Sequence, residues 1–67
     1  MTKNEMLLAA ANLEKMAAIN QMYERKIWET FERTGGKSSA NMAPVHAACG
    51  KEKLARAGIL RDEAAKL

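Results

Sequence analysis

Apolar side chains recur every three to four residues from Thr2 to Thr34, a stretch without glycine or proline, and this spacing predicts one long helix. Two stripes with a seven-residue period run along it, as in helices that pack lengthwise on other helices. The first stripe holds Met6, Leu13, Asn20 and Ile27, and the second holds Ala9, Met16, Tyr23 and Thr30. From these stripes we expect an oligomer interface formed by Met6, Leu13, Met16, Asn20, Tyr23 and Ile27.

Asn20 is the polar member of the first stripe, and two interpretations of it stay open. A buried asparagine in such a stripe fixes the pairing and register of the helices at some cost in stability. Alternatively, Asn20 is a tolerated polar residue at the edge of a contact between two helices of the same chain.

Both ends of the long helix carry local signals. Thr2 and Glu5 have the spacing of a capping box, in which each side chain bonds the other residue's amide. Gly35 can end the helix in the left-handed conformation. A helix over 2–34 would be roughly 48 Å long, whereas a compact chain of this length would be only roughly 28 Å across. We therefore expect a second chain to cover part of the helix.

The rest of the chain predicts a shorter second helix. Residues 35–41 are small and polar, as in a loop, and a helix over 42–57 follows, with Gly58 as its predicted end and a short helical turn over 59–67. The predicted fold is all-α. It is a single helical domain over 1–67, a helical hairpin of one long N-terminal helix and a shorter second helix, assembled as a homodimer or a higher oligomer.

Composition also favours association. Of 32 hydrophobic residues 13 are alanine, and Leu, Ile, Val and Phe together number 11, so the core of one chain would be thin. Small proteins with thin cores usually need a disulfide, a metal or a partner. Cys49 is the only cysteine, which excludes an intrachain disulfide, and His46 and Cys49 provide only two of the ligands that a closed metal site needs. We expect no metal and no cofactor.

Positive charge is concentrated in the second half of the chain. Residues 1–34 have five basic and five acidic side chains, so the whole net charge of +3 comes from 35–67. An anionic ligand or a nucleic acid would meet this half. The candidate contacts are Lys37, His46, Lys53 and Arg56. The simpler interpretation is a solvated basic helix face, because no aromatic residue is interleaved with these side chains for base stacking.

The sequence contains no motif that specifies a reaction. The run from Gly36 to Ser38 has the end of a phosphate-binding loop, but Phe31 occupies the position of its first glycine and the run follows a helix. Cys49 and His46 have no orienting carboxylate at an evident spacing. We therefore expect no enzymatic activity.

Trp28 and Phe31 are candidate anchors for a foreign protein, because tryptophan is enriched at the energetic centres of interfaces. The alternative places Trp28 in the core of the oligomer. The sequence shows neither a signal-peptide pattern nor the run of about 20 apolar residues that spans a membrane, and we expect a cytoplasmic protein. The function expected is that of a small non-enzymatic protein that regulates or inhibits a larger partner by protein–protein contact. The alternatives are a nucleic-acid-binding regulator and a binder of a small anionic ligand held between chains.

Overall fold

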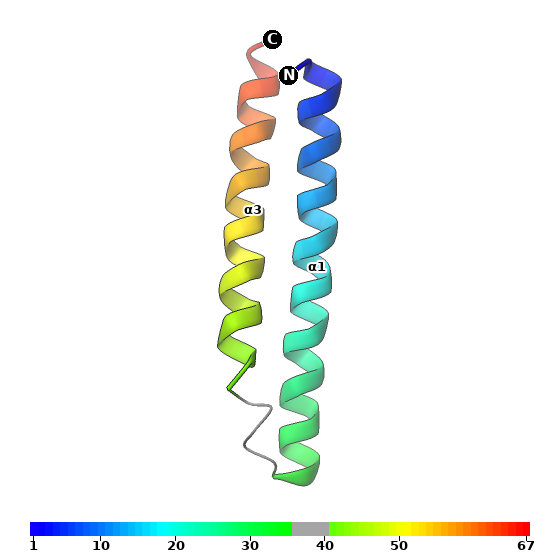
Figure 1. The fold of residues 1–67 in the computed structure, drawn as a ribbon, viewed down its shortest axis with the longest axis vertical. Helices are drawn as coiled ribbons and strands as arrows, with labels where there is room; N and C mark the ends of the chain where they lie inside the picture. Colours follow the sequence, from blue (N-terminus) through cyan, green and yellow to red (C-terminus); the bar gives the residue numbers. More distant parts are fainter. Residues whose placement is uncertain (36–40) are drawn as a thin grey trace.

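The chain is an antiparallel pair of helices, α1 (Lys3–Thr34) and α3 (Ala43–Ala65), in a computed structural model that describes residues 1–35 and 41–67. The two helices lie side by side, and both ends of the chain meet at the same end of the rod (Figure 1). The rod measures 50 × 13 × 13 Å between Cα atoms, with a radius of gyration of 15.3 Å. The predicted all-α hairpin is confirmed, and α1 spans nearly the whole length of the molecule.

Helix α1 begins and ends where local chemistry predicts. The Thr2 amide donates to Glu5 Oε1 at 3.1 Å, and the Glu5 amide donates to Thr2 Oγ1 at 3.2 Å, which completes the capping box. Gly35 has φ +67°, and its amide donates to the Phe31 carbonyl at 2.7 Å. A side chain at that φ would be strained, so glycine suits this end of the helix.

Helix α3 is longer than the sequence predicts. It continues through Gly58 to Ala65, so the predicted end at residue 57 and the separate turn over 59–67 are wrong. Gly58 has no positive φ, and a glycine inside a helix costs only about 1 kcal/mol relative to alanine. Good helix formers such as Leu60 and Ala64 follow it, and no proline does.

The two helices meet through small residues. Ala43, Gly50, Ala57 and Ala64 are buried at seven-residue intervals on α3, and Ala10 and Ala17 are buried on α1. A Cβ atom built on Gly50 would lie 3.5 Å from Asn20 Cβ and 3.6 Å from the Ala17 carbonyl oxygen, so the backbones approach closely. In the described part of the chain the buried hydrophobic residues are all alanines, and no large side chain is fully buried. The interface is therefore tight but has little apolar volume.

Candidate functional site

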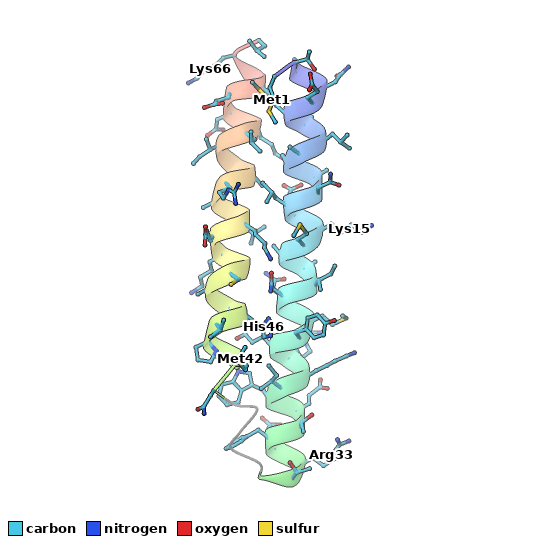
Figure 2. All side chains as sticks on the ribbon, in the orientation of Figure 1. Met1, Lys15, Arg33, Met42, His46 and Lys66 are labelled. Atoms are coloured by element: carbon cyan, nitrogen blue, oxygen red, sulfur yellow. The ribbon has the colours of Figure 1, made fainter. Side chains whose placement is uncertain are left out.

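A polar cluster of Asn20, His46 and Lys53 joins the two helices. Lys53 Nζ donates to Asn20 Oδ1 at 2.6 Å, and Asn20 Nδ2 lies 3.2 Å from His46 Nδ1. The Tyr23 ring stacks on the His46 ring, with centroids 5.5 Å apart and planes at 28°. Figure 2 shows His46 between the two helices. Asn20 therefore makes its contacts with the second helix of its own chain.

The cluster has one consistent arrangement of hydrogen bonds. A lysine ammonium only donates, so the oxygen of the Asn20 amide must face Lys53. The NH₂ group of that amide then faces His46 and donates to the lone pair of Nδ1. The Asn20 amide is thus held from both ends, which fixes the relative position of the helices at this level.

The positions of the buried small residues define two flanks of the hairpin. Viewed along a helix axis, the residue three positions after a given residue is rotated about 60° to one side of it, and the residue four positions after it is rotated about 40° to the other side. Asn20 follows Ala17 by three, and Lys53 follows Gly50 by three, so they share one side, which we call the Asn20 flank. Glu14 follows Ala10 by four and lies on the opposite side, which we call the Glu14 flank.

An ion pair within the chain occupies the Glu14 flank. Arg61 Nε donates to Glu14 Oε2 at 2.9 Å, and an Arg61 Nη2 hydrogen bond to Oε1 measures 2.5 Å. The hydrogen bond from Arg61 lowers the pKa of the Glu14 carboxyl, and the carboxylate in turn raises the pKa of Arg61. Both side chains remain more than two-fifths exposed, so the pair is a surface contact between the helices.

The residues predicted to form the oligomer interface fall into two groups. Met6, Leu13, Asn20 and Ile27 are half-buried on the face of α1 that carries buried Ala10 and Ala17. Met16 and Tyr23 are 48% and 49% exposed on the Asn20 flank. The first stripe therefore lies toward the chain's own second helix, whereas Met16 and Tyr23 of the second stripe stay about half exposed, even though the Tyr23 ring contacts His46. A contact of either stripe with another chain remains a prediction.

The aromatic pair of Trp28 and Phe31 lies near the loop end of α1, where the helix continues past the start of α3 (Figure 1). The two rings meet edge to face, with centroids 5.8 Å apart and planes at 89°. Trp28 is 42% exposed and Phe31 is half-buried. Much of the indole surface is thus open to contact.

The predicted anion-binding residues come together in part. His46 and Lys53 meet through Asn20, and exposed Arg56 follows on the same flank. Arg56 lines a shallow, open hollow of about 210 Å³ together with Ile59 and Leu60. Lys37 lies outside the described residues. Over 1–35 and 41–67, no group of three or more His, Cys, Asp or Glu is placed to hold a metal ion. The same residues include no helix with the length and apolarity to cross a membrane.

The contacts of Asn20 with His46 and Lys53, and the pair of Glu14 with Arg61, were not evident from the sequence. The available signal was positional, because each pair lies three or four residues from a small residue that packs between the helices. Comparison with protein-family models, curated proteins and solved structures found no match for this chain.

Proposed function

We propose that this chain is a small, non-enzymatic, cytoplasmic binding protein that self-associates and regulates or inhibits a larger protein by contact with its surface. The observation that supports this function is the distribution of apolar side chains. The buried hydrophobic positions described are all alanine, whereas Leu8, Met16, Trp28, Ile59 and other large apolar residues are at least two-fifths exposed. Most of the hydrophobic surface of the hairpin is therefore available for contact with other molecules, and its burial in a complex would be favourable.

The proposed contact with the larger partner is the Trp28 and Phe31 pair. An aromatic pair with one ring held by the other presents a large apolar surface with little conformational freedom to lose on binding. Its position near the loop end of α1 leaves most of the rod's length available for self-association. The two kinds of contact can therefore occur at once.

The alternative of a nucleic-acid-binding regulator has less support from the geometry. Helix α3 carries four lysine and arginine side chains, at positions 51, 53, 56 and 61. Two of them are already bonded within the chain, since Lys53 bonds Asn20 and Arg61 bonds Glu14. Phosphate contacts by either residue would compete with a bond inside the chain. Arg56 and Lys51 are exposed, and two such cations provide only weak, salt-sensitive attraction to a phosphate backbone.

The test compares the tagged wild-type chain with Trp28→Ala and Leu54→Ala as baits in cells that contain the natural partner. Leu54 is the matched control, because Leu54 and Trp28 both lie on the Glu14 flank, four residues after Gly50 and eleven after Ala17, and are 43% and 42% exposed. We expect one protein to be retained by wild type and Leu54→Ala and lost with Trp28→Ala. Its binding is then reproduced with purified components in 0.5 M salt, about the level at which purely ionic contacts are strongly screened.

Native mass spectrometry of the same samples separates the two roles of Trp28. If Trp28→Ala keeps the oligomer and loses the partner, the proposed anchor is supported. If Trp28→Ala breaks the oligomer and no protein depends on Trp28 for binding, Trp28 belongs to the oligomer core and the proposed function is refuted. A co-purifying oligonucleotide or small anion of defined mass would also refute it, in favour of the alternatives.

A further inference from the structure

We propose that a second copy of this chain docks lengthwise on the Asn20 flank and forms a four-helix bundle with the first. This inference rests on the self-association in the proposed function and adds the surface that carries it. Beside Asn20 and Lys53, the part of this flank that the second copy would cover consists of Ala9, Met16 and Tyr23 on α1 and Cys49, Arg56 and Leu60 on α3.

The α1 side of this flank is the stripe that the chain's own second helix leaves largely exposed, apart from the contact of Tyr23 with His46. Helices in bundles bury two stripes that alternate three and four residues apart. The first stripe of α1 is half-buried on the face toward α3, and the second is open, with Met16 48% and Tyr23 49% exposed. A helix from another chain laid against the second stripe would complete the burial that α3 leaves unfinished.

The α3 side offers a place for an incoming side chain. Arg56, Ile59 and Leu60 line the open hollow of about 210 Å³. In bundles, a side chain of one helix inserts between four residues of the facing helix. Arg56 can keep its guanidinium in water while its methylene stem covers apolar surface, so this cation does not prevent docking.

The Glu14 flank is less suited to the same role. Its charges already meet within the chain, in the bond between Arg61 and Glu14. The large apolar side chains of the Glu14 flank that are at least two-fifths exposed are Leu54 and Trp28. Docking there would have to cover an ion pair whose side chains are still more than two-fifths exposed, which costs free energy, whereas Lys53 on the Asn20 flank is already half-buried and bonded to Asn20.

The dimensions of the hairpin fit a second copy. The rod is 50 Å long, and two helices with side chains are roughly 20 Å wide, so one face offers about 1,000 Å². Stable interfaces bury about 800 Å² per partner. A copy of the chain has the same length and can cover the whole stripe from Ala9 to Tyr23, including the half-buried residues beside it. The all-alanine core of one hairpin would then be joined by a core of large side chains.

The experiment uses methionine oxidation of the unmodified protein, read by mass spectrometry of peptides, because Met16 and Met22 form a matched pair. They are 48% and 45% exposed in a single hairpin, but Met22 follows Met16 by six residues and lies about 120° further around the helix, away from α3. We expect Met16 to oxidise several-fold more slowly than Met22 at high protein concentration, and the two rates to converge on dilution. Equal rates at every concentration would overturn the proposal.

Two variants then test the surface by sedimentation. Met16→Lys should sediment with the mass of one chain at a concentration where wild type has twice that mass. Leu54→Lys adds the same charge on the Glu14 flank at a similar exposure, 43%, and should keep the doubled mass. The reverse result would overturn the docking surface but leave the proposed self-association intact. If the wild-type chain has the mass of one chain at all concentrations, both the docking surface and the proposed self-association are overturned. Partner binding through Trp28 is tested by the separate bait experiment.

Discussion

The close approach of the helices at Gly50 predicts that Gly50→Ala stabilises the protein. A methyl group placed there would lie 3.5 Å from Asn20 Cβ and 3.6 Å from the Ala17 carbonyl oxygen, which are ordinary van der Waals distances. The substitution therefore requires no shift of either helix. It also replaces the poorest common helix former, apart from proline, with the best one.

The expected gain has two parts. Replacing glycine by alanine in a helix interior contributes about 1 kcal/mol through backbone entropy. The new methyl group is buried against α1, and burying one such group contributes up to about 0.8 kcal/mol. Gly58→Ala provides the matched control, because nothing lies within 4 Å of a Cβ at Gly58 and only the first part applies. Gly50→Ala should thus stabilise at least as much as Gly58→Ala.

The assay is thermal and urea unfolding followed by circular dichroism at 222 nm. For a domain of this size 1 kcal/mol corresponds to about 4–8 °C in Tm. All variants are compared at one protein concentration, because self-association makes Tm depend on concentration. The free energies of unfolding from urea provide the second measure.

A loss of stability in Gly50→Ala together with a gain in Gly58→Ala would refute the reasoning. It would mean that the helices approach more closely at Gly50 than the distances of 3.5 and 3.6 Å imply, so that the methyl group overpacks the interface. Equal gains would show that the buried methyl group adds nothing beyond helix propensity.

Two further predictions concern the polar contacts between the helices. The folded pKa of Glu14 is lowered, chiefly by the hydrogen bond from Arg61, so its contribution to stability is complete above the ordinary carboxyl range and is lost as the pH falls. Urea unfolding between about pH 5 and pH 3 should therefore show a steeper loss of stability for wild type than for Glu14→Gln, and parallel curves would contradict this. Asn20→Ala removes the acceptor of half-buried Lys53 and should cost about 1–3 kcal/mol, whereas Gln21→Ala, at the exposed neighbouring position, should change little. Equal effects of the two substitutions on urea unfolding would show that the bonds of Asn20 do not stabilise the hairpin.

The limits of α1 were predictable from the sequence because their causes are local. Thr2 and Glu5 are three residues apart and satisfy each other's amides, and Gly35 adopts a conformation that strains other residues. The seven-residue stripes indicated a helix that packs lengthwise, and the structure has such a pair. The spacing also indicates that Asn20 lies on the face of α1 that meets another helix, whereas the interface with a second chain that it predicts for Asn20, Met16 and Tyr23 stays a prediction.

The tertiary structure decided the end of α3 and the role of Asn20. By local rules Gly58 is a plausible end of the helix. In the structure, however, α3 continues to Ala65, and Ala57 before the glycine and Ala64 after it are both buried against α1. Asn20 bonds side chains 26 and 33 positions away in the sequence. Sequence periodicity shows which residues share a face, but only the pairing of the two helices determines which side chains meet across it, because that depends on how closely the small residues let the backbones approach.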